Sequence, residues 1–217
     1  AAVAATTKYI AASKEITLTI GKKVLTPKVE NVTRVYGTEN PDFTIGYTGL
    51  VSPDTKADID TEPIAFTFAV IDSNVDDYYI LLTGGLDNNY TFDIGFSSFG
   101  FLTIIPQTSI LTFSDIDKTY GDAPFDLEAI TNSDGTIKYS IVGGDTDAIA
   151  LGGGDKEIAS IKTAGTVTIR ATVDGAINYT DAYQNITLTI AKSVLTATAD
   201  NITRPYGDPN ELTISYD

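Results

Sequence analysis

The sequence repeats itself at long range, and this repeat limits what the chain can fold into more than any other feature. Residues 9–40 and 179–210 align without a gap at an offset of 170, and 17 of the 32 aligned positions are identical. A weaker copy lies between them, because NVTRVYG (31–37) and NITRPYG (201–207) are matched by DIDKTYG (115–121). The repeated Tyr-Gly pairs divide the 170-residue period into two domains of about 85 residues each.

The repeat also predicts the domain boundaries. Each domain opens with an apolar strand and a Tyr-Gly turn, and closes with a Thr-alternating strand: EITLTI (15–20), GFLTII (100–105) or NITLTI (185–190). We therefore expect complete domains at 23–106 and 107–191. Residues 1–22 are expected to be the C-terminal part of an upstream repeat domain, and residues 192–217 the N-terminal part of a following one. The sequence, which contains no Met, is then a piece of a longer tandem array.

Hydrophobic alternation with a period of two runs through both expected domains. It is clear in TVTIRATV (166–173) and in NYTFDIGF (89–96). Gly, Asn and Asp residues separate such segments, and they predict a turn at TGGLDNN (83–89). The pattern predicts an all-β fold of tandem Ig-like β-sandwich domains. Links of two or three residues between the domains favour a linear array. A β-grasp-like arrangement of 23–106 remains an alternative, because its middle (51–62) is rich in loop residues.

Charge and composition exclude several classes of function. The chain carries 14 basic and 29 acidic residues, a net charge of −15, which disfavours binding to nucleic acid or to an anionic membrane surface. Without His or Cys it lacks the commonest general base and the thiol nucleophile. No apolar run is long enough to insert into a membrane. We therefore expect a protein without catalytic activity, without nucleic-acid partners and without direct membrane insertion.

The repeated Tyr-Gly pairs are expected to be structural turns in which glycine adopts a positive φ and tyrosine covers the end of the sandwich. An exposed ligand-stacking role for the tyrosines is the alternative. The pairs are Tyr36–Gly37, Tyr120–Gly121 and Tyr206–Gly207. A basic residue precedes each tyrosine by two positions, and we expect it to pair with neighbouring carboxylates. These residues are Arg34, Lys118 and Arg204.

Acidic clusters are the strongest indication of a ligand. Carboxylate oxygens bind Ca²⁺ when loops bring several of them together, although none of the clusters here matches a known calcium loop. The alternative is a solvated acidic surface that keeps the array soluble. The candidate calcium ligands are Asp58, Asp60 and Glu62 in the first domain and Asp145, Asp147, Asp155 and Glu157 in the second. No other cofactor is expected.

Most of the chain resembles a known group of bacterial domains. VLTPKVENVTRVYGTENPDFTIGYTGL (24–50), with LDNNYTFDI (86–94) and GFLTI (100–104), is similar to the MBG domain of the Tyr-Gly-X type. SILTFSDIDKTYGDAPFDLEA (109–129) and the segment 163–192 resemble related bacterial Ig-like and MBG/YDG repeats. The resemblance implies an extracellular location in a large bacterial surface protein, an adhesin or stalk, and it implies no catalytic residues. Thr38 departs from the pattern, since the other two copies have Asp122 and Asp208.

Two functions follow from these observations. The first is a structural spacer that also presents multivalent adhesive contacts, with neighbouring repeat domains as its partners. Gliding-motility adhesins are one setting that the resemblance implies. The alternative is a discrete, Ca²⁺-stabilised module that binds surface glycans or proteins. In the absence of Trp, its stacking platform would use Tyr78, Tyr79 or Tyr183.

Overall fold

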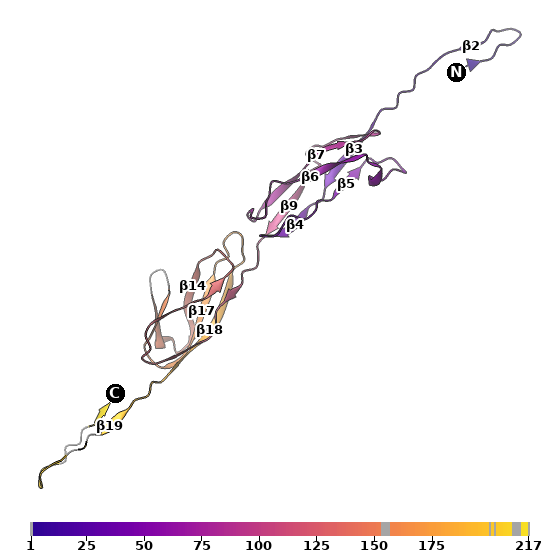
Figure 1. Ribbon diagram of the computed structural model, residues 1–217. Coiled ribbons are helices and arrows are strands. Elements are labelled where there is room, and N and C mark those ends of the chain that lie inside the picture. Colours follow the sequence, from indigo (N-terminus) through magenta and orange to yellow (C-terminus); the bar gives the residue numbers. More distant parts are fainter. Residues whose placement is uncertain (1, 153–156, 200, 202, 210–213, 217) are drawn as a thin grey trace. The chain divides into compact units, whose positions relative to one another are not determined.

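The computed structural model describes residues 2–152, 157–199, 201, 203–209 and 214–216, and they form two compact units, 1–105 and 106–217. Strands dominate both units (Figure 1). Helical structure among the described residues is limited to two 3-10 turns, Lys56–Asp58 and Thr146–Ala148. Within the same residues, no helix is long and apolar enough to cross a membrane. The predicted all-β fold is confirmed.

The first unit is built from two sheets. Its larger sheet has the order β4-β9-β7-β6 and its smaller sheet the order β5-β3-β8. The strands are β3 (Lys23–Val29), β4 (Val32–Val35), β5 (Ile45–Thr48), β6 (Thr61–Phe66), β7 (Asp77–Leu86), β8 (Tyr90–Phe92) and β9 (Gly100–Ile105).

Apolar side chains from both sheets meet in the core of this unit. Val29 and Ile45 come from the smaller sheet, and Ile80, Leu102 and Ile104 from the larger one. Burying such side chains is the main stabilising contribution to a fold of this size. Two sheets with a shared core, and no helix packed against them among the described residues, make this unit a sandwich and not a β-grasp domain.

The second unit repeats this architecture. Its larger sheet has the order β11-β18-β17-β14, a smaller one the order β12-β16-β15, and β10 pairs with β13. The core cluster includes Ile149, Ile169 and Leu188. The strands are β10 (Leu111–Thr112), β11 (Ile116–Thr119), β12 (Phe125–Asp126), β13 (Ile130–Thr131), β14 (Ile137–Gly144), β15 (Ile149–Gly152), β16 (Ile158–Ile161), β17 (Gly165–Val173) and β18 (Ala182–Ala191).

The larger sheets of the two units share one topology. In each, the strand that leads into the Tyr-Gly turn pairs in parallel with the closing strand: β4 with β9 and β11 with β18. The closing strand then pairs antiparallel with a long central strand, β7 or β17, which pairs with β6 or β14. Strands β4, β9, β7 and β6 therefore correspond in order to β11, β18, β17 and β14.

The described residues at the two ends of the chain form two small hairpins and an extended segment. Strand β1 (Ala2–Val3) pairs with β2 (Ala12–Ser13), and β19 (Ala197–Ala199) with β20 (Ile214–Tyr216). The strand predicted at 15–20 is not formed, since a strand needs a neighbour for its backbone hydrogen bonds and none of the described residues supplies one. Its Ile16, Leu18 and Ile20 are 79%, 82% and 86% exposed.

Two predicted segment boundaries were wrong. The alternation through NYTFDIGF does not continue as a strand, because β8 ends at Phe92 and the chain then turns, with the N–H of Ser98 donating to the carbonyl of Gly95 at 2.9 Å. The turn expected at 83–89 begins later, because β7 continues to Leu86. Glycine at 84 and 85 permits this, since both residues adopt a positive φ within the strand.

Candidate functional site

Each Tyr-Gly pair lies at the centre of a tight turn. The glycine φ is positive in all three, at 75°, 101° and 97° for Gly37, Gly121 and Gly207. The residue after each glycine donates its N–H to the carbonyl of the residue before the tyrosine: Thr38 to Val35 at 3.2 Å, Asp122 to Thr119 at 3.0 Å and Asp208 to Pro205 at 3.4 Å. A positive φ at the third residue of such a turn is typical of type II. The glycines therefore have a structural reason to recur.

The tyrosines of these turns differ in their surroundings. The N–H groups of Tyr36 and Tyr120 donate to the carbonyls of Ile105 and Ala191, at 2.9 and 2.8 Å, and so extend the parallel pairing with the closing strands. The side chain of Tyr36 packs against the first core, whereas Tyr120 is half exposed and Tyr206 is fully exposed. Of these three tyrosines, only Tyr36 packs against a core cluster.

Arg34 is a buried arginine that holds a connection in place. Its side chain is 5% exposed, and Nη2 donates to the carbonyl of Val70 at 2.6 Å while Nη1 lies 3.4 Å from the carbonyl of Ile71. Nε donates to Oδ1 of Asn40 at 2.7 Å, and the Asn40 amide donates to the carbonyl of Ala69 at 2.7 Å. Together Arg34 and Asn40 fix the β6–β7 connection against the Tyr-Gly turn.

The prediction that Arg34 pairs with a carboxylate was wrong. Its partners are carbonyl and amide oxygens, which stabilise a buried guanidinium through hydrogen bonds. Lys118, its counterpart in the second unit, lies 4.6 Å from the ring centre of Phe125. Asn40 could have been found in the sequence, because Arg34 and Asn40 recur together at an offset of 170 as Arg204 and Asn210, while the second domain has Lys118 and Pro124.

The carboxylates proposed as calcium ligands in the first unit have separate protein partners. Asp58 accepts from the N–H and hydroxyl of Thr55, at 2.7 and 2.8 Å. Asp60 accepts from the N–H of Asn88 at 2.9 Å. Glu62 accepts from the hydroxyl of Tyr47 at 2.9 Å and lies 3.0 Å from the ammonium of Lys56.

Among the candidates in the second unit, Asp145 also has a partner within the protein. Asp145 accepts from the N–H of Thr166 at 2.9 Å, and Asp147 lies in the 3-10 turn at 146–148. Asp155 lies outside the described residues. Within the part of the chain that the structure describes, no three Asp, Glu, His or Cys residues are grouped so that they could hold a metal ion.

Calcium titration gives a direct test of these carboxylates. We expect millimolar Ca²⁺ to leave the melting temperature of the first unit unchanged, because Asp58, Asp60 and Glu62 already hydrogen-bond elsewhere and do not converge. Differential scanning calorimetry with Mg²⁺ as the control ion measures this. A rise in melting temperature with Ca²⁺ alone, lost in Asp60→Asn, would contradict the expectation and restore the calcium hypothesis.

Asp87 is a buried carboxylate that sequence analysis missed. It is 3% exposed and accepts from the N–H groups of Asp60, Asn89 and Tyr90, at 3.0, 2.7 and 2.9 Å. Its backbone carbonyl accepts from the ammonium of Lys22 at 2.7 Å. The hydrogen bond from Asp60 is the main cause that holds the pKa of Asp87 below its ordinary value. This carboxylate ties the β7–β8 turn to the segment that precedes β6.

The lowered pKa of Asp87 makes the first unit sensitive to acid. A carboxyl whose pKa is lower in the folded state contributes stability above the unfolded pKa of about 4, and loses it as the pH falls through the folded pKa. We expect Asp87→Asn to weaken the unit at neutral pH and to flatten its pH dependence below pH about 4. Denaturation curves at several pH values measure this, with the exposed Asp117→Asn as control. Equal pH dependence in Asp87→Asn and the unsubstituted chain would contradict it.

A comparison with family models gives one match, and it includes the first of the three Tyr-Gly turns. Residues 25–99 match the MBG domain (YGX type). The matched segment runs from within β3 to beyond β8 and includes the Tyr36–Gly37 turn and the Arg34–Asn40 pair, and we use the name MBG domain for the first unit, in which the match lies. No curated protein matches the chain.

Three solved structures show a distant likeness to this chain. The Drosophila N-cadherin EC1-4 structure is 10% identical, with 76% of this chain and 50% of that chain covered and a TM-score of 0.32. The human mucin-like protocadherin EC1-2 structure is 10% identical, with 81% and 98% covered and a TM-score of 0.32. The endo-fucoidan hydrolase MfFcnA4 of glycoside hydrolase family 107 is 13% identical, with 60% and 22% covered and a TM-score of 0.29. The chain spans half the length of the N-cadherin structure.

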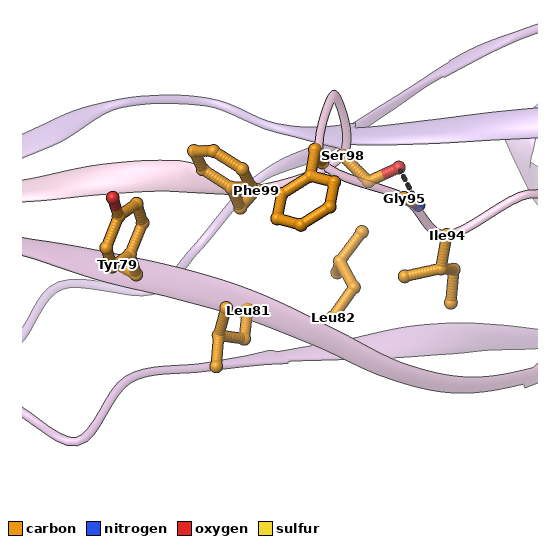
Figure 2. A pocket seen from close by; sticks show the side chains of 8 residues that line it. Tyr79, Leu81, Leu82, Ile94, Gly95, Ser98 and Phe99 are labelled. Atoms are coloured by element: carbon orange, nitrogen blue, oxygen red, sulfur yellow. Dashed lines mark hydrogen bonds between the residues drawn. The ribbon is translucent and has the colours of Figure 1, made fainter.

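The MBG domain carries an apolar hollow of about 520 Å³ beside β7. Figure 2 shows it, with Tyr79, Leu81 and Leu82 on the strand and Ile94, Ser98 and Phe99 on the segment before β9. Tyr79 is 57% exposed, and its ring centre lies 5.0 Å from that of Phe99 and 5.1 Å from that of Phe101. The sequence did not predict this hollow, because odd-numbered and even-numbered positions of the segment 77–82 are both largely apolar and do not show which side chains face outward.

The three tyrosines that the sequence offers as alternative stacking platforms lie in different surroundings. Tyr78 points into the core of the MBG domain, and its hydroxyl donates to the carbonyl of Asn74 at 3.0 Å. Tyr183 lies in the second unit, with the guanidinium of Arg170 4.7 Å from its ring centre. Of the three, only Tyr79 borders the hollow.

Proposed function

We propose that this chain is a segment of a repetitive bacterial surface protein, an adhesin or stalk, in which MBG and related Ig-like domains alternate as structural spacers. In this proposal the domains have no catalytic role, and their partners are the neighbouring repeat domains of the same long chain. Weak contacts repeated along such an array gain strength through effective concentration, which suits multivalent adhesion.

The observation that carries this proposal is the register of the C-terminal hairpin. In the MBG domain, Pro27, Lys28 and Val29 of β3 pair with Tyr47, Gly46 and Ile45 of β5. In β19 and β20, Ala197, Thr198 and Ala199 pair with Tyr216, Ser215 and Ile214. Each β19 residue lies 170 positions after its β3 counterpart, and the same Tyr-Gly turn follows both strands. This supports a third domain of the MBG type that begins near residue 192.

The N-terminal segment supports an upstream domain by the same comparison. Its Ile16, Leu18 and Ile20 correspond to Ile186, Leu188 and Ile190 of β18. The latter are only 3%, 0% and 3% exposed in the core of the second unit. Both copies of this sequence are apolar on one face, but only the copy in β18 is buried. This fits an N-terminal segment that is the closing strand of another domain and packs in the core of that domain.

Surface location is tested on cells of the organism that makes the protein. Antibodies raised against residues 23–191 should label intact cells, and external protease should remove the label. An antibody against a cytoplasmic protein is the control for cell integrity. If the antibodies label only permeabilised cells, the proposed surface location is wrong.

The spacer role has a separate physical test. Domains that follow one another end to end give a radius of gyration well above the value of about 17 Å for a compact protein of 217 residues. Small-angle X-ray scattering of the dilute chain measures it. A radius near the compact value would contradict a spacer and leave surface location untouched.

A further inference from the structure

The link that leads from a domain of the second type into an MBG domain is very short. Strand β18 ends at Ala191, and β3 begins at Lys23. In the repeat of 170 residues, Lys23 corresponds to Ser193 and Lys22 to Lys192. In the third domain proposed above, Lys192 is then the single residue between β18 and the first strand. Two chain steps span at most about 7 Å, so the adjoining ends of two such domains meet.

The MBG domain shows one half of this junction. Lys22 donates from its ammonium to the carbonyl of Asp87 at 2.7 Å. The hydroxyl of Tyr90 donates to Oδ2 of Asp54 at 2.7 Å and accepts a backbone N–H of the 51–54 loop at 3.0 Å. Link, turn and loop line one hollow of about 280 Å³. The carboxylate of Asp54 is therefore held at the end where the chain enters this domain.

The second unit shows the other half. A hollow of about 280 Å³ lies where β18 ends, and its lining includes Tyr120, Lys162 and Lys192. The residues that line it carry two ammonium groups and no carboxylate. The N–H groups of Lys162 and Thr163 donate to the carbonyl of Ala148, at 2.8 and 3.2 Å, and hold the β16–β17 turn in place. Cations therefore lie at the end where the chain leaves this unit.

Tyr120 is exposed at this end although its own sandwich is complete. Tyr36 occupies the same place in the repeat and packs against the core of the MBG domain, whereas Tyr120 is 49% exposed. The backbone of Tyr120 is fixed beside the link, since its N–H donates to the carbonyl of Ala191 at 2.8 Å. Tyrosine is enriched at protein interfaces, because its ring buries apolar area while its hydroxyl stays hydrated. A partner at this end would explain the difference from Tyr36.

We propose that this end of the second unit binds the MBG-type domain that follows it directly in the chain. Tyr120 packs on the loop of that domain that corresponds to 51–54, and Lys162 pairs with the counterpart of Asp54. The proposal rests on the order of domains proposed above. It adds an interface that holds one domain against the next.

The charges of the two halves are complementary. In the MBG domain the ammonium of Lys22 is already bound to Asp87, so Lys192 is expected to donate to the same turn of the following domain. This leaves the ammonium of Lys162 for the carboxylate that corresponds to Asp54. In a chain with a net charge of −15, such a pair offsets repulsion between neighbouring domains. Pairs of this kind determine orientation more than affinity.

A tandem chain tests the interface. In this chain residues 1–193 are followed by residues 24–217, so the period of 170 is kept and a complete second unit leads through its own link into a complete MBG domain. Because the sequence has no Cys, Ser140→Cys in the first half and Lys28→Cys in the second half, both at exposed positions, take one spin label each. Double electron–electron resonance measures the distance between the labels. We expect one narrow distance distribution, because a docked junction has a single geometry.

Substitutions at the junction should abolish this narrow distribution. The variant carries Tyr120→Ala and Lys162→Glu in the first half of the tandem chain. The same two substitutions should leave the melting temperature of the 217-residue chain unchanged, because both side chains are exposed there. Lys138→Glu is the control and should keep the distribution narrow. It makes the same change of charge at an exposed position that pairs with Thr172, near the other end of β17.

Each of four results would overturn the proposal. The unsubstituted tandem chain could give a broad distribution, the junction variant could keep a narrow one, or Lys138→Glu could broaden it equally. A lower melting temperature of the doubly substituted 217-residue chain would assign Tyr120 and Lys162 to the fold of the second unit. None of these results bears on surface location or on the spacer role, since a flexible junction is compatible with both and each has its own test.

Discussion

Replacing Leu188 by alanine is expected to lower the free energy of unfolding of the second unit by about 3–4 kcal/mol. Leu188 is fully buried in the centre of β18 and packs in the core cluster of that unit. Its truncation removes apolar contacts and leaves a cavity that neighbours such as Val167 and Ile190 fill only in part. Hydrogen exchange of the amides of β17 and β18, followed by mass spectrometry, measures the loss within this unit.

The chain supplies its own matched control for this substitution. Leu18 occupies the equivalent position of the repeat, within the same sequence ITLTI, and is 82% exposed. Leu18→Ala should therefore change the stability of either unit by less than about 0.5 kcal/mol. Equal losses from Leu18→Ala and Leu188→Ala would show that the N-terminal segment is packed in solution, contrary to the structure.

Replacing Arg34 by alanine should destabilise the MBG domain by about 3 kcal/mol. The substitution leaves the carbonyls of Val70 and Ile71 without their guanidinium donors, and it removes the partner of Asn40. Burial prevents water from replacing all of these bonds, so the cost exceeds that of a surface arginine. Calorimetry should show one transition moved to lower temperature while that of the second unit stays in place.

Two variants make the Arg34 result specific. Arg170→Ala removes an arginine from the outer face of the second unit, where it contacts Asn185 and Tyr183, and should cost less than about 1 kcal/mol. Arg34→Lys keeps the charge but supplies fewer directed hydrogen-bond donors. We therefore expect it to lower the free energy of unfolding by more than Arg170→Ala and by less than Arg34→Ala. A loss in Arg34→Ala no larger than in Arg170→Ala would contradict the role of Arg34 in fixing the β6–β7 connection.

The sequence predicts the strands and turns whose residues follow a regular spacing. Alternation placed Ile186, Leu188 and Ile190 on one face of a strand, and all three are buried. The Tyr-Gly spacing likewise identified turns that share one hydrogen bond and one sign of φ. Both features are local, so a few neighbouring residues determine them.

The sequence does not predict features that depend on contacts between residues far apart along the chain. Arg34 and Asp87 are polar residues on irregular or short elements, and their burial follows from segments far along the chain. The sequence also does not show which side chains of β7 point outward, because this strand is apolar on both faces and only its register with β6 and β9 distinguishes them. The calcium candidates looked clustered in sequence, yet each hydrogen-bonds to a different neighbour.

The parallel pairing of β4 with β9, and of β11 with β18, determines how each unit bears tension. The strand before the Tyr-Gly turn and the closing strand run in the same direction, side by side. Force that reaches these two strands along the chain pulls the earlier one toward its start and the closing one toward its end, so the two slide past one another lengthwise. The backbone hydrogen bonds between Ile116–Thr119 and Leu188–Ala191 then carry the load together instead of opening one after another. Such a unit resists extension within its larger sheet.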